Sequence, residues 1–258
     1  MTDRTGLILL DRVEGGEIAL ITLNRPEKLN ALSHAMSEEL DGIIKEVDED
    51  PTVRCIIFTG AGDRAFSAGF DLNEMSGWSR DEWLRMMYRI EPWVFRWATV
   101  SKPTIAAVNG VAHGAGAILA SNCDFRFGCE RSSFRFTAAS GGAVNNTWFL
   151  PHIVGMTKAK DFIYSAEAKS AEYCNDAGMF SEFVAPDEVL PASIEYAKRI
   201  CVHPAAGLLH SKRLLRESIG RTFHDAYTAE NATMGWVLSL PDPADNPHVQ
   251  EWGEHKGE

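Results

Sequence analysis

The sequence predicts an α/β protein with a strand-and-helix core and a helical C-terminal region. In the first part of the chain, short apolar runs alternate with segments whose apolar residues repeat at helical spacing. From residue 158 onward every predicted element is a helix. We therefore expect a strand-and-helix core over residues 1–200 and a helical region over residues 201–258.

The first strand and helix follow from residues 18–50. Residues 18–23 read IALITL, an apolar run typical of a buried strand, and Asn-Arg-Pro at 24–26 ends it as a turn. Ser33 is a suitable N-cap for a helix that runs to about residue 50. Its apolar side chains follow helical spacing: Met36, Leu40, Ile43, Ile44 and Val47.

The middle of the chain continues the alternation. Residues 53–59 predict a second strand, and residues 60–69 a loop with glycine at both ends. Residues 79–97 predict a helix, which Pro92 should kink or break. Residues 104–108 predict a third strand.

A glycine-rich turn over residues 109–116 precedes a helix to about residue 122, and residues 124–129 predict a fourth strand. The later segments with helical patterns are 158–165, 170–177, 191–202, 206–219 and 223–238. The polar residues 241–258 predict a loose tail.

Composition narrows the class of partner. Acidic residues number 36 and basic residues 25, for a net charge of -11. Nucleic acid is therefore not expected as a partner, because phosphate backbones need a basic surface. Residues 1–12 show no signal-peptide pattern and no apolar stretch approaches a membrane span, so we expect no membrane association and a cytoplasmic protein.

Two glycine turns carry most of the functional information. Residues 65–72 read AFSAGFDL after a strand, and residues 109–116 read NGVAHGAG between a strand and a helix start. Small residues let a ligand approach the backbone, and free N–H groups at a helix start favour an oxyanion. The second turn lacks the Gly-Lys-Ser/Thr ending of a P-loop and the acidic residue of a dinucleotide fingerprint.

In order and spacing, four segments together resemble the enoyl-CoA hydratase/isomerase, or crotonase, superfamily. They are residues 21–32, 65–75, 102–116 and 153–156. The resemblance implies a crotonase-like spiral of ββα turns with a helical C-terminal trimerisation region. It also implies an acyl-CoA thioester substrate, a homotrimer or dimer of trimers, no metal, and no cofactor beyond the CoA moiety of the substrate.

The resemblance assigns the oxyanion hole to two backbone N–H groups, those of Phe70 and Ala115. Many members have glycine at the second position, but alanine keeps the N–H. The CoA contacts implied in the same way are Lys28, Ala31, Ala65, Ser67 and Ala68. Carbonyls of residues 65–67 would meet the adenine edge, and Lys28 either meets a phosphate or is a solvated surface residue.

The resemblance also indicates that the catalytic carboxylates of related enzymes are missing from this chain. The two glutamates of family hydratases fall on Ile118 and Ala138, so a standard two-glutamate hydration is not expected. An acidic residue used by some isomerases and by the dehalogenase branch falls on Asn146, which either orients a substrate or water or only shapes a turn.

Glu91 and His113 are the remaining candidates for the proton-transferring group. Glu91 lies in an apolar stretch, where burial would raise its pKa, but a helical glutamate is more often solvated. His113 directly precedes Gly114 in the second turn, and its ring either exchanges protons there or points into the core.

Three functions stay open from the sequence: an atypical hydratase, an isomerase or hydrolase on a bulky or aromatic acyl-CoA, and a catalytically inactive CoA-binding member. Aromatic residues near the first turn either line an acyl pocket or belong to the core: Phe70, Trp78, Trp83, Trp93 and Trp97.

Overall fold

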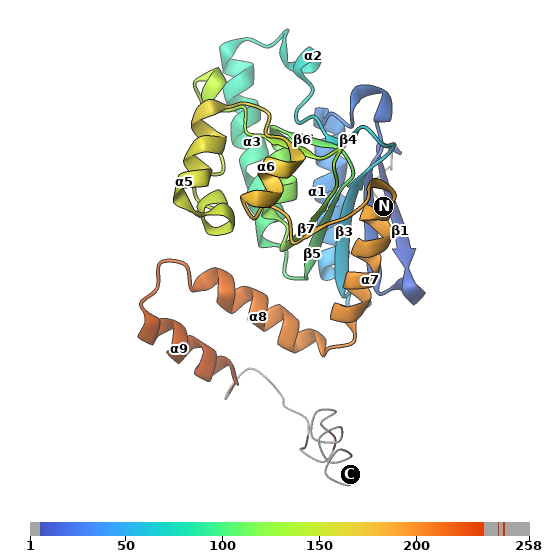
Figure 1. Cartoon of the computed structure of the whole chain (residues 1–258), viewed down its shortest axis with the longest axis vertical. Coiled ribbons are helices and arrows are strands. Elements are labelled where there is room, and N and C mark those ends of the chain that lie inside the picture. The colour runs from blue at the N-terminus through green and yellow to red at the C-terminus, as the bar shows by residue number, and fades with distance from the viewer. Residues whose placement is uncertain (1–5, 235–241, 243–244, 246–258) are drawn as a thin grey trace. The chain divides into compact units, whose positions relative to one another are not determined.

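The computed structural model describes residues 6–234, 242 and 245, and it divides the chain into two compact units, Met1–His203 and Pro204–Glu258 (Figure 1). The division falls three residues later than the boundary expected after residue 200. Helix α7 runs to Cys201, so the chain leaves the first unit only after that helix has ended. Each unit is described by itself.

The larger sheet of the first unit has six strands in the order β1-β2-β3-β5-β7-β9. Its strands are β1 (Ile8–Val13), β2 (Ile18–Leu23), β3 (Cys55–Gly60), β5 (Thr104–Val108), β7 (Phe125–Gly128) and β9 (Glu182–Phe183). The pair β1–β2 is antiparallel and the other pairs are parallel. The sequence pattern missed β1 and β9, because both edge strands carry exposed side chains rather than a continuous apolar run.

A smaller sheet holds β4 (Ala65–Ser67), β6 (Val111–His113) and β8 (Ser133–Arg135), paired in parallel in that order. Each of these strands directly follows a strand of the larger sheet along the chain. The repeat is therefore two strands and then a helix, and it places the ends of β4 and β6 side by side. Strands of three residues are too short to show a periodic pattern in the sequence.

The helices follow the order of the predicted segments. They are α1 (His34–Glu49), α2 (Leu72–Met75), α3 (Arg80–Thr99), α4 (Ala115–Asn122), α5 (Leu150–Ser165), α6 (Ala171–Asp176), α7 (Val189–Cys201), α8 (Ala205–Glu217) and α9 (Phe223–Ala232). Short 3-10 turns lie at Glu14–Gly16, Pro26–Lys28, Ala139–Gly141 and Pro186–Glu188.

The expected break at Pro92 is wrong, because α3 continues through this residue to Thr99. Pro92 lies on the exposed side of α3, as does Tyr88 four residues earlier. Solvent can therefore satisfy the Tyr88 carbonyl that the missing N–H leaves unpaired.

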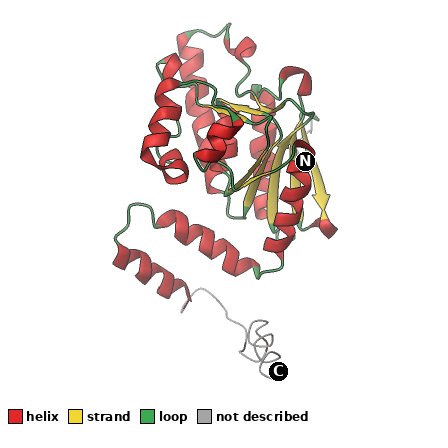
Figure 2. Ribbon diagram, viewed as in Figure 1, coloured by secondary structure: helices red, strands yellow, loops and turns green. Residues whose placement is uncertain are grey.

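Two apolar cores cover the two faces of the larger sheet. Figure 2 shows the strands of this sheet and the helices that surround it. Alternate residues of β3 point to opposite faces: Ile56 packs in the core that contains α1, α3 and α4, and Ile57 packs in the core that contains α7. Because β3 is buried on both faces, its sequence reads as a continuous apolar run, as the α/β prediction required.

The second unit contains α8 and α9, joined by a short turn. Leu215 and Phe223 are largely exposed on these helices. The expected trimer role of this region stays a prediction. The last part of the predicted helix 223–238 and nearly all of the predicted loose tail 241–258 lie outside the described residues.

Among the described residues, no helix combines the length and the apolar character needed to cross a membrane.

Candidate active site

The two glycine turns meet in the structure. A Cβ placed on Gly69 would lie 2.7 Å from the His113 carbonyl oxygen and 3.0 Å from the Ala115 backbone nitrogen. Gly69 also has a φ of 93°, a conformation that L side chains rarely adopt. Both the positive φ and the close contacts require glycine at this position. Because glycine has no side chain, the end of β4 can lie against the start of α4.

The start of α4 packs on β4 through a second close approach. A Cβ on Gly116 would lie 2.3 Å from the Ser67 carbonyl oxygen. Ser67 is buried, its hydroxyl donates to the Asn30 carbonyl at 2.8 Å, and it accepts from the Gly69 N–H at 3.2 Å. These contacts hold the first turn rigidly against the helix that carries Ala115.

The backbone N–H groups of Phe70 and Ala115 have no hydrogen-bond partner among the residues that the structure describes. Ala115 is the first residue of α4, so no helical carbonyl lies in front of its N–H. Phe70 pairs with Leu32 through its neighbours, since Leu32 donates to the Gly69 carbonyl and Asp71 donates to the Leu32 carbonyl. The two N–H groups therefore lie on adjacent turns and are available to donate to a ligand oxygen.

An ion pair that the sequence reading missed supports the Phe70 turn. The Arg25 guanidinium donates to Asp71 Oδ2 at 3.1 Å and to the Ala31 carbonyl at 2.7 Å. Asp71 caps α2 by accepting from the Asn73 N–H. Burial would raise the pKa of Asp71, but the hydrogen bonds from Arg25 and Asn73 and the charge of Arg25 together hold it below its usual value.

This ion pair predicts a pH-dependent stability. The pKa of Asp71 is lowered from 3.8 in the folded protein. The contribution of the ionised carboxylate to the free energy of unfolding is therefore complete above about pH 4, and it is lost as the pH falls through the folded pKa. We expect Asp71→Asn to destabilise the fold by about 1 kcal/mol at pH 7 and to lose this difference in acid. Thermal unfolding of both proteins between about pH 7 and pH 2 measures this. An equal difference at every pH would contradict the assignment, and the exposed Asp63→Asn serves as the control.

The loop that follows β8 contacts α4 at both ends of that helix. Gly114 donates its N–H to the Arg135 carbonyl at 2.8 Å, and a Cβ on Gly114 would lie 3.3 Å from Thr137 Oγ1. At its other end the loop returns to α4, where Asn146 Nδ2 donates to Ser121 Oγ at 2.8 Å. The loop is therefore tied to α4 at both ends of the helix, next to Gly114 and at Ser121.

Ile118 lies on α4 and Ala138 lies on this loop, and these are the positions at which the resemblance places the two missing carboxylates. Ile118 is 7% exposed and lies one turn beyond Ala115 on α4. The Ala138 carbonyl accepts a hydrogen bond from the Ala143 N–H at 2.9 Å, so the loop reverses direction between these residues. Neither residue can supply or accept a proton.

Asn146 is buried and has a φ of 50°. The structure agrees with the turn-shaping alternative, because asparagine tolerates the left-handed region and its amide ties the loop to α4, whereas a role in orienting a substrate or water stays a prediction. Its Oδ1 is buried without a partner among the described residues. Ser121, the α4 residue that holds this amide, carried no recognisable signal in the sequence.

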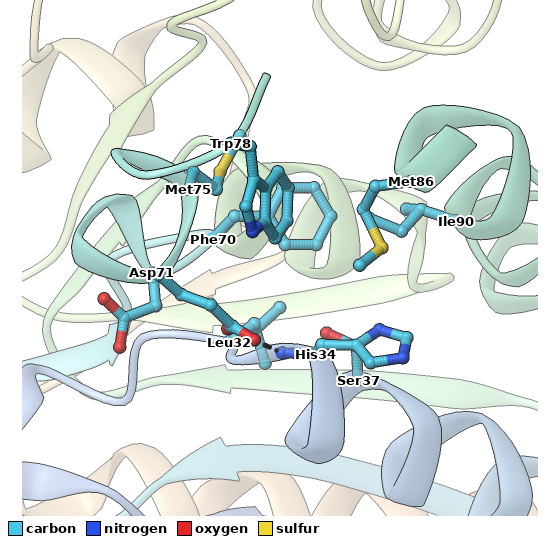
Figure 3. Close-up of a pocket in the computed structure, with 10 residues that line it drawn as sticks. Leu32, His34, Ser37, Phe70, Asp71, Met75, Trp78, Met86 and Ile90 are labelled. Atoms are coloured by element: carbon cyan, nitrogen blue, oxygen red, sulfur yellow. Dashed lines mark hydrogen bonds between the residues drawn. The ribbon is translucent and has the colours of Figure 1, made fainter. Parts of the chain in front are cut away.

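A small pocket adjoins Phe70 on the side of α1, α2 and α3 (Figure 3). Apolar side chains dominate its lining, with a few polar groups at the rim: Leu32, His34, Ser37, Phe70, Asp71, Glu74, Met75, Trp78, Met86 and Ile90. Glu74 fixes α2 to this pocket because its Oε2 accepts from the His34 N–H at 2.9 Å. Phe70 and Trp78 are the two aromatic residues with carbocyclic rings in this lining.

The other three tryptophans of the aromatic group considered above, Trp83, Trp93 and Trp97, do not line this pocket. Trp93 and Trp97 belong to the main core, and Trp83 is 36% exposed. The aromatic pocket expected from the sequence is thus reduced to Phe70 and Trp78.

Of the two alternatives left open for Glu91, the solvated one is confirmed. Its side chain is exposed on α3 in a surface hollow with Pro92 and Phe95. Helical geometry explains this exposure, since Ile90 takes the inward position and Glu91 follows it about 100° around the helix. Neither Glu91 nor the hollow adjoins the pocket next to Phe70.

The backbone of His113 lies close to Gly69, but its ring is directed elsewhere. Its ring nitrogen Nε2 is 3.0 Å from Ser133 Oγ on the neighbouring strand β8. Burial, and then the positive charge of Arg135, lower the pKa of His113. The ring is therefore neutral at neutral pH and interacts along the smaller sheet, which gives no support for the expected proton exchange at the turn.

The five expected CoA contacts lie together, but not all are accessible. Lys28 is exposed and Ala68 is half-buried, and Ala68 donates its N–H to the Leu29 carbonyl at 2.9 Å. Ala65 and Ser67 are buried, and the Ala65 carbonyl accepts from Asn30 Nδ2 at 2.8 Å. Ala65 and Ser67 are thus engaged inside the fold, and their contact with CoA stays a prediction. Ala31 is 9% exposed and lies between the two groups.

Comparisons with known proteins show the family of the chain. The family model described as enoyl-CoA hydratase/isomerase matches residues 14–236. The 1,2-epoxyphenylacetyl-CoA isomerase of Escherichia coli is 35% identical, over 90% of this chain and 86% of its own. The short-chain-enoyl-CoA hydratase of Clostridium acetobutylicum is 31% identical, over 89% of each chain. The crystal structure of an enoyl-CoA hydratase from Bacillus anthracis superposes with a TM-score of 0.89 at 28% identity, over 96% of each chain.

Proposed function

The chain belongs to the enoyl-CoA hydratase/isomerase family, and from that premise we propose that it stabilises a thioester enolate or tetrahedral oxyanion through the N–H groups of Phe70 and Ala115. As a crotonase-fold enzyme it acts on acyl-CoA. The observation that carries the proposal is the contact of the two turns at Gly69, which puts two unpaired donors on adjacent backbone segments.

The chemistry follows from what these donors can do. When a base removes a proton next to a thioester carbonyl, or a nucleophile adds to it, negative charge develops on the carbonyl oxygen. Two preorganised N–H donors stabilise that charge, and one such donor can be worth roughly 3–4 kcal/mol. The CoA moiety would lie along residues 28–31 and Ala68, where Lys28 is exposed to meet a phosphate.

The residues at positions 118 and 138 favour a reaction other than standard hydration. Ile118 and Ala138 offer no carboxylate to activate water, so the chain lacks the pair of groups that family hydratases use. An isomerase on an aromatic acyl-CoA is supported by the 35% identity with the 1,2-epoxyphenylacetyl-CoA isomerase and by the rings of Phe70 and Trp78. A catalytically inactive CoA-binding protein remains the alternative if no proton-transferring group is supplied.

A substrate panel tests the function. The protein is incubated with enoyl-, aryl- and β-oxoacyl-CoA esters, and products are followed by mass spectrometry. Conversion of an ester other than crotonyl-CoA is expected. Hydration of crotonyl-CoA at the rate of an ordinary family hydratase would refute the assignment, and tight CoA-ester binding without any conversion would favour the inactive alternative.

Restoring the two carboxylates gives a sharper prediction. We expect the double variant Ile118→Glu with Ala138→Glu to hydrate crotonyl-CoA at least 10-fold faster than the unmodified protein, because general acid–base catalysis typically contributes about 10²–10⁴-fold. The absorbance of the conjugated thioester measures the rate. The matched control is Ile118→Gln with Ala138→Gln, which has the same shape without the acid; equal rates in both double variants would contradict the prediction.

A further inference from the structure

Arg126 is a buried cation at the C-terminal end of α4 that the proposed chemistry does not use. It is 6% exposed and belongs to strand β7. Its Nη1 donates to the carbonyls of Ser121 at 3.1 Å and Cys123 at 2.6 Å, and its Nε donates to the Met179 carbonyl at 2.6 Å. Within the described part of the chain, no carboxylate forms an ion pair with this guanidinium. A buried arginine without such a partner is unusual in a folded interior.

The guanidinium keeps its charge in this setting. Arginine stays protonated in proteins at neutral pH. Burial lowers the pKa of Arg126, and the adjacent Cys123 and Asp124 offset only part of that effect. Asp124 is also engaged elsewhere, since its Oδ2 accepts from the Thr104 N–H at 2.8 Å and from the Thr104 hydroxyl at 3.0 Å. A net positive charge, solvated by backbone carbonyls, therefore remains at this end of α4.

Helix α4 connects this charge to the proposed oxyanion hole. All eight residues of the helix are buried, so protein surrounds it from Ala115 to its last turn. Ser121 lies six residues beyond Ala115, a rise of roughly 9 Å. Adding the hydrogen bonds at the two ends places the guanidinium roughly 15 Å from an oxygen bound by the Ala115 N–H. With an effective dielectric constant of about 20, a unit charge at that distance changes an ionisation equilibrium about 5-fold.

We propose that Arg126 is a positioning residue for the reaction: it holds the last turn of α4, and its charge stabilises the anion that forms at the Ala115 N–H. The inference rests on the proposed function, because it takes this N–H as a donor to the thioester oxygen. Other charges near the hole are screened or paired, since Asp71 forms an ion pair with Arg25 and Arg135 is half-buried. Solvent screens the charge of the buried Arg126 less than that of an exposed group.

Acetoacetyl-CoA is a probe of this effect that does not require the substrate to be known. Loss of a C2 proton to the solvent converts this β-oxo thioester to its enolate, which has a near-ultraviolet absorbance of its own. The ratio of bound enolate to bound neutral ester at a fixed pH measures how strongly the site stabilises the anion. We expect Arg126→Gln to lower this ratio about 5-fold, and Arg126→Lys to keep it nearly unchanged because lysine retains the charge.

Two further variants separate the effect of charge from damage to the fold. Arg131→Gln removes a positive charge at a more exposed site and should leave the ratio unchanged. Asp124→Asn removes the negative charge next to Arg126 and should raise the ratio about 2-fold. A rise of this kind cannot come from a damaged fold, so this variant decides the question if Arg126→Gln does not fold.

The proposal is overturned if Arg126→Gln keeps the ratio, if Arg126→Lys loses as much as Arg126→Gln, or, where Arg126→Gln does not fold, if Asp124→Asn leaves the ratio unchanged. Ala115→Pro, which removes the donor itself, distinguishes this inference from the proposed function. A ratio that falls in Ala115→Pro but not in Arg126→Gln defeats this inference alone. A ratio that changes in neither variant, or a bound ester that ionises no more readily than the free ester, defeats the proposed function as well.

Discussion

The variant Ala115→Pro is expected to lower kcat/KM about 10²–10³-fold while the protein stays folded. Proline removes the N–H that would bind the oxyanion, and its ring occupies the space in front of the nitrogen. The first position of a helix tolerates proline well, because its N–H has no helical partner, and Ala115 is the first residue of α4. The measurement is steady-state kinetics with the ester identified by the substrate panel, together with a thermal unfolding curve.

A matched exchange separates the loss of the donor from the effect of proline on a helix start. Ala171 is also a buried first residue, in α6, after the N-cap Ser170. Ala171→Pro should unfold at a temperature similar to that of Ala115→Pro and should retain nearly full activity. If Ala115→Pro were as active as Ala171→Pro, the Ala115 N–H would have no part in the reaction.

The variant Gly69→Ala is expected to have the second large effect, on both activity and stability. The new Cβ would lie 2.7 Å from the His113 carbonyl oxygen, and the backbone would hold an alanine at a φ of 93°. We expect a loss of about 2–4 kcal/mol in the free energy of unfolding, from the strain and the clash together. Activity should fall at least 100-fold, because the clash pushes apart the turns that carry the two donors.

Gly62→Ala is the control for the strain alone. Gly62 has a φ of 79°, but its Cβ would meet only Pro26 Cβ, at an ordinary 3.4 Å. This variant should lose about 1–2 kcal/mol of stability and little activity. Kinetics and chemical denaturation of both variants provide the comparison, and a Gly69→Ala enzyme with normal kcat/KM would show that the spacing of the turns does not matter for catalysis.

Much of the fold followed from local patterns in the chain. The buried strands β2, β3 and β5 and the amphipathic helix α1 match their predicted segments, because burial on both faces or on one face leaves a periodic trace in the sequence. The three-residue strands β4, β6 and β8 left no such trace, and their pairing depends on the strands of the larger sheet that precede them.

In the candidate site, too, some features follow from the local sequence and others depend on tertiary contacts. The sequence by itself determined the family and located both turns, because a glycine at a positive φ and a helix start are properties of a few consecutive residues. It also determined the absence of the two carboxylates at Ile118 and Ala138, which is a matter of residue identity alone.

Only the tertiary structure decided which side chains accompany the turns. Arg25 meets Asp71 across 46 residues, and Asn146 meets Ser121 across 25, so no local pattern could have paired them. The same distinction explains why Glu91 and His113 were poorer predictions than the turns. Whether a side chain points to solvent, to β8 or to the substrate depends on the packing of neighbouring elements, whereas a backbone N–H is presented wherever the turn itself forms.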